Sequence, residues 1–290
     1  MKKIYYITAV FATLFLVGCG DGIDLPGVNV ETDLNKIPLP DNNVNLEQVE
    51  LKPSTEPMLH EGLHTEEDFQ RIRDKKAAGE EPWVSAYQLL VESQFSQKTA
   101  DTYPTEWIKR GISGDENYMN AARGATIVYQ QALRWKIEQD DEYAAKAVEN
   151  LNKWVQTCVG VTGNTNLSLA AGLYGYEFAI AGELLRDYGG WDRADFAAFQ
   201  NWLLKVFYPA NDDFLKRHHD TNALHYWANW CLCNIAAKMA IGIVTDRRDI
   251  YNEGIGHLQT GDTNGRLRRA IYHDYAPDYN FAQWQESGRD

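Results

Sequence analysis

Residues 143–158, YAAKAVENLNKWVQTC, decide the fold class of this chain. Their apolar positions alternate at intervals of four and three residues, which places them on one side of an α-helix. This stripe consists of Ala144, Val148, Leu151, Val155 and Cys158. The segment is therefore predicted to be a helix that buries one face.

Helix signals continue on both sides of this segment. Thr65–Asp68 predicts a capping box, and Pro82 is expected in the first turn of the next helix. Asp115 is expected to open a helix, and apolar stripes also follow Phe196 and Ile250. The stretch 224–243 is apolar nearly all round, which predicts an inner helix.

No segment alternates with a period of two, so strands are expected to be minor. The alternation of amphipathic and fully apolar helices favours an all-α fold with two concentric layers, an (α/α) toroid or incomplete barrel of paired antiparallel helices. A stacked solenoid is the competing arrangement.

The charge balance excludes one class of partner. The 290 residues contain 28 Lys and Arg against 41 Asp and Glu, a net charge of −13, and show no basic stripe. Nucleic acid is therefore not an expected partner. An anionic polymer would have to be met by a locally basic cleft.

The N-terminus predicts export. Residues 1–19 combine Lys2 and Lys3 with an apolar stretch and end at Cys19, as in a lipoprotein signal peptide whose cysteine is lipidated. The proline-rich residues 20–57 are expected to form a flexible tether, and 58–290 the folded domain. The remaining cysteines are odd in number, which argues against a full disulfide framework. They are expected to be small buried residues: Cys158, Cys231 and Cys233.

The densest polar and aromatic cluster is Asn222–Trp230. If this stretch is helical, Asn222, His225 and Asn229 share one face, because they lie three and four residues apart. Such a face requires a ligand or a hydrogen-bonded network that only fixes core packing, and the pattern leaves both open.

A second cluster, Gly265–Tyr275, concentrates arginines and phenols. It is either the basic patch that a polyanion needs or a solvated loop. The chain then stops at Asp290 without a cap or polar tail, which favours a fragment of a longer protein.

Two stretches carry a resemblance. His225–Trp230 (HYWANW) and Gln283–Asp290 (QWQESGRD) are similar to signature stretches of bacterial alginate lyase-like proteins. The closest group is polysaccharide lyase family 38, with family 5 more distant, and the opening His64–Asp68 with Pro82–Trp83 also resembles this group. The similarity spans residues 58–290. It implies an (α/α) toroid that is incomplete at its C-terminus, in a periplasmic or outer-membrane lipoprotein of a Gram-negative bacterium.

The resemblance also implies an activity. Such proteins cleave a uronate polymer, such as alginate or glucuronan, by β-elimination, and they use Asn, His, Arg and Tyr without a metal or other cofactor. His225 corresponds to the histidine. Asn166 is assigned as the amide, with Asn164 and Asn222 as alternatives. Family 5 has adjacent Asn and His before a Tyr-Trp pair, whereas Ala223 and Leu224 stand there in this chain.

Arg269 and Tyr275 are assigned as the remaining catalytic pair, with Arg266, Tyr272 and Tyr279 as rivals. The predicted substrate-binding residues are Asn222, Tyr226, Trp230, Arg266, Tyr272, Tyr279, Gln285 and Arg289.

Three other functions compete with this prediction. The first is a non-catalytic glycan-binding lipoprotein of the outer membrane. The second is an (α/α)-toroid glycoside hydrolase, which needs two carboxylates from candidates such as Asp220, Glu253 and Glu286. The third is a metal-dependent lyase using His218 and His219, which are otherwise expected to be a solvated pair.

Overall fold

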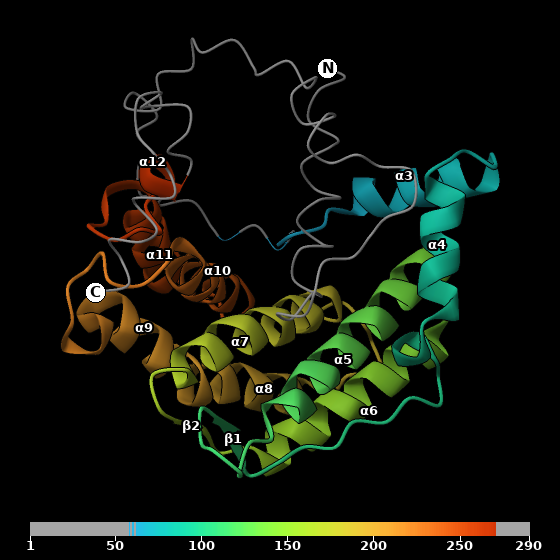
Figure 1. The fold of residues 1–290 in the computed structure, drawn as a ribbon. Helices are drawn as coiled ribbons and strands as arrows, with labels where there is room; N and C mark the ends of the chain where they lie inside the picture. Colours follow the sequence, from blue (N-terminus) through green and yellow to red (C-terminus); the bar gives the residue numbers. More distant parts are fainter. Residues whose placement is uncertain (1–57, 59, 61, 271–290) are drawn as a thin grey trace, which may run out of the picture. The chain divides into compact units, whose positions relative to one another are not determined.

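The computed structural model describes residues 58, 60 and 62–270, all within one of the two units into which the chain divides, residues 49–290. Helices dominate this part of the chain, so the prediction of an all-α fold is confirmed (Figure 1). The elements are α3 (Glu66–Ala77), α4 (Trp83–Glu92), η2 (Gln94–Ser96), β1 (Trp107–Arg110), α5 (Tyr118–Glu138), α6 (Asp141–Thr157), β2 (Gly160–Gly163), α7 (Leu167–Leu184), α8 (Arg193–Val206), α9 (Tyr208–Arg217), η3 (His218–Asp220), α10 (Ala228–Val244), α11 (Arg248–Thr260) and α12 (Leu267–Ala270).

Two of the helix starts predicted from capping signals agree with the structure, and a third is shifted. The capping box before α3 is present, with the Thr65 hydroxyl accepting from the Asp68 N–H and the Asp68 carboxylate accepting from the Thr65 N–H. Pro82 directly precedes α4. Helix α5 begins at Tyr118, three residues later than predicted. The delay arises because the side chain of Asn117 bonds to β1, accepting from the Lys109 N–H and donating to the Trp107 carbonyl.

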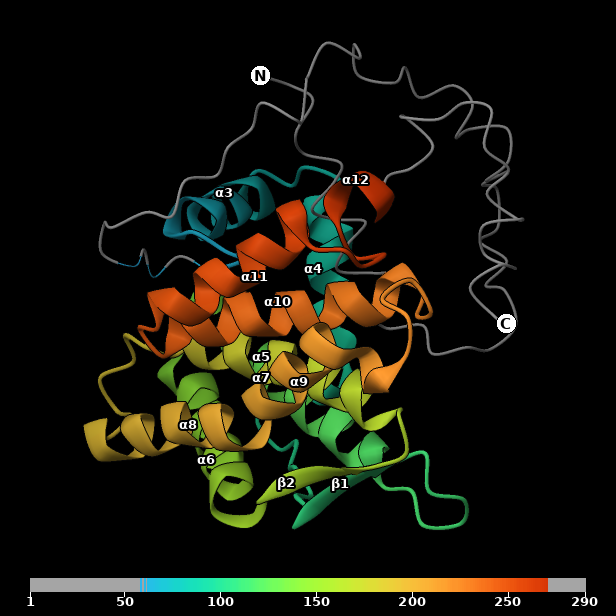
Figure 2. The ribbon, with the colours of Figure 1, turned by 90° about the vertical axis from the view of Figure 1, so that its left-hand side faces the viewer.

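Three central helices, α5, α7 and α10, form a layer in which α7 packs against both others. They run in the same direction. Gly172 near the start of α7 opposes Cys233 near the start of α10, and Arg186 just after α7 donates to the carbonyl of Val244 at the end of α10 over 2.8 Å. Helix α6 packs on α5, and α11 packs on α10 (Figure 2). Closure of these pairs into a toroid stays a prediction.

The close contact between α7 and α10 depends on a glycine, Gly172. A Cβ atom on Gly172 would lie 2.6 Å from the Cys233 Sγ and 3.0 Å from the Cys233 carbonyl carbon. Only glycine allows the two helix backbones to approach this closely. Helix α10 is rich in buried residues, as predicted, although it begins at Ala228 rather than Leu224.

Aromatic rings fill the centre of the core. Trp154, Phe178, Trp202 and Phe207 form a chain of ring contacts with centroid distances between 5.0 and 5.4 Å. These four aromatic side chains are therefore core residues. The described cysteines, Cys158, Cys231 and Cys233, are free and buried, which confirms their predicted role.

The two short strands pair in parallel, with Trp107 opposite Gly160 and Arg110 opposite Gly163. Strands are minor in the described part of the chain, as predicted. Because β1 leads into α5 and β2 leads into α7, the first turns of both helices lie beside this pair. One end of the central layer is thus tied together by backbone hydrogen bonds.

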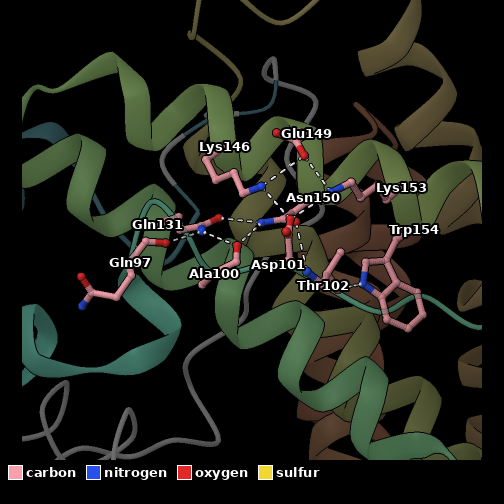
Figure 3. A network of polar contacts seen from close by, with 10 residues as sticks. All are labelled: Gln97, Ala100, Asp101, Thr102, Gln131, Lys146, Glu149, Asn150, Lys153 and Trp154. Atoms are coloured by element: carbon pink, nitrogen blue, oxygen red, sulfur yellow. Dashed lines mark hydrogen bonds and ion pairs between the residues drawn. The ribbon is translucent and has the colours of Figure 1, made fainter.

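A polar network fixes the segment that precedes β1 (Figure 3). The fully buried Asn150 donates to the carbonyl of Ala100 over 2.9 Å and accepts from the N–H of Thr102 over 3.1 Å. Lys146 and Lys153 both contact the carboxylate of Asp101. Within the described residues, no helix has the length and apolar character needed to cross a membrane.

Candidate active site

The candidate site lies where β2 enters α7 and where the chain between α9 and α10 passes it. The side chain of His219 comes from η3, and its Nε2 atom lies 3.0 Å from the hydroxyl oxygen of Ser168 in the first turn of α7. The backbone of Thr165 raises the pKa of the His219 imidazole, against the larger lowering effect of burial. The Ser168 contact holds the start of α7, beside Asn166, against the α9–α10 connection.

Asn166 is half-buried at the N-cap position of α7, but its side chain does not cap the helix. Its backbone N–H and its Nδ2 both donate to Oδ1 of the exposed Asn164, each over 2.9 Å. Asn164, the predicted alternative, therefore orients Asn166. The structure thus places Asn166 two residues before Ser168, the residue that His219 contacts.

The predicted helical face of Asn222, His225 and Asn229 is wrong. Helix α10 begins at Ala228, and the preceding residues form turns. Oδ1 of Asn222 accepts from the Leu224 N–H over 2.8 Å, and the Asn222 carbonyl accepts from the His225 N–H over 2.9 Å. Asparagine competes in this way with the helix by bonding the local backbone. His225 is half-buried, and its ring lies edge-on against Tyr226 with a centroid distance of 5.0 Å.

The prediction that His218 and His219 form a solvated pair is also wrong. His218 is 3% exposed, and its Nε2 lies 3.8 Å from the Sγ of Cys231. His219 is held by Ser168, and burial lowers the pKa of both imidazoles. His218, His219 and Asp220 have φ angles of 49°, 53° and 60°. Left-handed backbone at three successive non-glycine residues is strained, and such strain concentrates at functional sites.

Arg110 at the end of β1 is a candidate that the sequence prediction missed. Its guanidinium carbon lies 4.7 Å from the centre of the Tyr118 ring, and its Nη1 is buried with no hydrogen-bond partner among the described residues. Burial raises the pKa of the nearby Tyr174 phenol to about 12, against the lowering effect of Arg110. The sequence signal, one Lys-Arg pair before a glycine, was too weak to select it.

Two arginines of the second cluster, Arg266 and Arg269, bond to backbone. The Nε of Arg266 donates to the carbonyl of Gln259 over 2.9 Å. Nη1 of Arg269 donates to the carbonyls of Asp262 and Thr263. Both arginines therefore stabilise the turn between α11 and α12. The remaining predicted site residues lie outside the described residues, as does the lipidation site: Tyr272, Tyr275, Tyr279, Gln285, Arg289 and Cys19.

Of the aromatic residues predicted to bind substrate, the two that are described, Tyr226 and Trp230, pack against Phe214. Tyr226 is 9% exposed and contacts Phe214 at a centroid distance of 5.1 Å, whereas Trp230 is half-buried. Two of the carboxylates considered for hydrolysis are ion-paired, Asp220 with Arg217 and Glu253 with Lys238. Glu286 lies outside the described residues.

The described residues contain no group of three or more His, Cys, Asp and Glu side chains that could hold a metal ion. The polar groups gathered at the start of α7 are instead amides, imidazoles and one guanidinium. Hydrogen-bond donors of this kind suit an anionic ligand such as a carboxylate.

One comparison with known proteins identifies the family. The family model described as alginate lyase matches residues 72–270. The match covers most of the chain, so the protein is a polysaccharide lyase and belongs to the alginate lyase family. A comparison with curated proteins gives no match.

Proposed function

We propose that this protein cleaves a uronate polymer, alginate or glucuronan, by β-elimination, as a lyase of the family 38 type. The observation that carries the proposal is the contact between His219 and Ser168, which holds the α9–α10 connection, where His225 also lies, against the start of α7, two residues after Asn166. The same end of the central layer holds Arg110, whose buried Nη1 has no hydrogen-bond partner among the described residues. In a chain with a net charge of −13, such a set of donors needs an anionic partner.

β-Elimination removes the proton at C5 of a uronate and expels the glycosidic oxygen at C4. The neighbouring carboxylate opposes this step, because its negative charge disfavours a carbanion at C5. Hydrogen bonds to the carboxylate oxygens counter that effect, most strongly where water is excluded. We assign this role to Asn166 and His225, and we add Arg110 as a cationic donor.

The proton transfers are assigned to Tyr275, assisted by Arg269. A phenol with a pKa of about 10 is a poor base at neutral pH, and a nearby guanidinium favours the phenolate. The tyrosine would accept the C5 proton and return a proton to the leaving oxygen. For the opposite C5 epimer, His225 is the alternative base. Arg266, Tyr272 and Tyr279 are the rivals for these roles.

The cellular setting is also proposed. Export as a lipoprotein through residues 1–19, with lipid at Cys19 and a tether over 20–57, would hold the lyase at the periplasmic or outer membrane surface. The anionic polysaccharide is then the partner, and neither nucleic acid nor a cofactor is required.

The test is a product assay of the full-length protein on polymannuronate, polyguluronate and glucuronan. Ultraviolet absorbance from the unsaturated sugar end should rise with time on at least one polymer. Tyr275→Phe should abolish the rise, whereas Tyr103→Phe, a change at a 74% exposed tyrosine, should not.

Two results would overturn the proposal. Polymer binding without any rise in absorbance would favour a glycan-binding protein. Cleavage into products without a double bond would favour hydrolysis. Undiminished turnover of Tyr275→Phe would transfer the proton-transfer role to Tyr272 or Tyr279.

A further inference from the structure

Asn264, in the turn between α11 and α12, has an unusual pair of hydrogen-bond partners. The side chain is 4% exposed. Its Nδ2 donates to the carbonyl of Leu224 over 2.9 Å and to the carbonyl of Tyr226 over 2.8 Å. These two residues flank His225. A single amide group thus holds the backbone on both sides of the proposed catalytic imidazole.

The carbonyl oxygen of the Asn264 side chain lacks a hydrogen bond within the described part of the chain. Oδ1 of Asn264 is buried and has no hydrogen-bond partner among the described residues. An unsatisfied buried acceptor costs about 1–3 kcal/mol. The unpaired oxygen destabilises the folded state, so the favourable contribution of Asn264 comes from the two hydrogen bonds that its Nδ2 donates.

The turn that carries Asn264 is itself fixed against α10. A Cβ on Gly265 would lie 2.4 Å from the Cys231 Cβ, so this glycine packs directly on the helix that follows the His225 turn. The Gly265 N–H donates to the Thr263 hydroxyl over 3.3 Å. Arg269 caps the same turn through the Thr263 carbonyl. Asn264 therefore connects the His225 turn to the segment that carries Arg266 and Arg269.

We propose that Asn264 is a positioning residue for the lyase reaction, which orients His225 by holding the carbonyls of Leu224 and Tyr226. This inference rests on the proposed role of His225. The residues 222–227 form turns without helical hydrogen bonding, so they lack the regular ladder that would otherwise fix the imidazole. Two hydrogen bonds from one rigid amide supply that constraint.

The test compares Asn264→Asp and Asn264→Ala with the wild-type protein. Both variants remove the Nδ2 donor. Asn150→Asp is the matched control, because Asn150 is also a buried amide whose Nδ2 donates to a backbone carbonyl, in a network that contains none of the proposed site residues (Figure 3). Each variant is assayed below its own unfolding transition.

The kcat of the Asn264 variants should fall by about 100-fold, the effect of a misplacement of about 1 Å, while KM changes much less. The kcat of Asn150→Asp should stay within about twofold of the wild type. The inference is overturned if the Asn264 variants keep the wild-type kcat, or if Asn150→Asp loses as much.

A second measurement separates this inference from the proposed function. The rate at which diethyl pyrocarbonate modifies His225, followed by mass spectrometry, should change in Asn264→Ala and not in Asn150→Asp. If the wild type forms no unsaturated product, the proposed function fails, and an altered modification rate would still support the positioning of His225. An unchanged rate in Asn264→Ala overturns the inference.

Discussion

The Nε2 atom of His219 lies 3.0 Å from the Oγ atom of Ser168, and this contact joins the strained turn after α9 to the first turn of α7. The two residues are 51 positions apart in the sequence. Because Ser168 is 1% exposed, water does not replace the bond when it is lost. The contact therefore sets the position of the loop that carries Asn166.

Ser168→Ala should lower the free energy of unfolding by about 1–2 kcal/mol, because the half-buried imidazole of His219 loses its hydrogen bond to a buried hydroxyl. We also expect slower product formation, since Asn166 shares this turn. Urea unfolding and initial rates measure the two effects. Ser85→Ala is the control, an exposed helical serine bonded to Glu81, and it should shift stability by less than about 0.5 kcal/mol. Equal effects of the two changes would contradict the prediction.

Arg110→Met should reduce product formation by at least about 100-fold while changing stability by less than about 1 kcal/mol. The reason is that Nη1 of Arg110 has no hydrogen-bond partner to lose among the described residues, whereas a buried donor aimed at a transition-state charge contributes several kcal/mol. Steady-state kinetics and thermal unfolding separate the effects.

Arg186→Met provides the contrast to this variant. Arg186 bonds the Glu183 carboxylate and the Val244 carbonyl, so its loss should cost about 3 kcal/mol of stability and leave kcat unchanged. Full activity of Arg110→Met would exclude a role for Arg110 in binding the carboxylate.

Gly172→Ala should destabilise the protein by about 1–3 kcal/mol, because the added methyl group overlaps with Cys233 and pushes α7 away from α10. Gly256→Ala should instead raise the free energy of unfolding. Gly256 lies inside α11, and no atom lies within 4 Å of an added Cβ, so alanine gains about 0.5–1 kcal/mol of helix propensity. Chemical denaturation of both variants checks the prediction, which fails if the two shifts have the same sign.

The raised pKa of Glu177 predicts that the free energy of unfolding depends on pH. Burial raises the pKa of its carboxyl from 4.5 to about 7, although the Thr126 hydroxyl, 3.0 Å away, acts in the opposite direction. The folded state therefore keeps a proton that the unfolded state releases, and stability is lost as the pH rises from about 4.5 to about 7.

Glu177→Gln should accordingly be more stable than the wild type at pH 8, by up to roughly 3 kcal/mol, and equal to it near pH 4. Urea unfolding at both pH values measures the difference. Glu149→Gln is the control, because the lysines Lys153 and Lys146 lower the pKa of Glu149, and no gain at pH 8 is expected. A pH-independent difference for Glu177→Gln would contradict the assignment.

The helices with strong local signals could be predicted from the sequence. The capping box at Thr65 and the stripe that begins at Ala144 give α3 and α6 with nearly correct limits, because both signals involve residues within one helix. The small sheet was not predicted. Its strands have four residues each and pair across 53 positions, so no local pattern encodes them.

The candidate site was harder to predict for the same reason. Helical spacing suggested a common face for Asn222 and His225, but the Asn222 side chain bonds the local backbone and the helix begins later. His219 was assigned to a solvated loop because its partner, Ser168, is remote in the sequence. Arg110 stands out only when its surroundings are known, since a buried Nη1 atom with no hydrogen-bond partner among the described residues is a property of three-dimensional packing.

The shared direction of α5, α7 and α10 has an electrostatic consequence. Each long helix carries about half a positive elementary charge at its first turn, and those of α5 and α7 follow directly from the paired strands. These partial charges give a protein with a net negative charge one end that attracts an anionic polymer, with no need for additional lysine or arginine residues. That attraction is electrostatic and partly solvent-exposed, so capture of the polymer should weaken as the ionic strength rises.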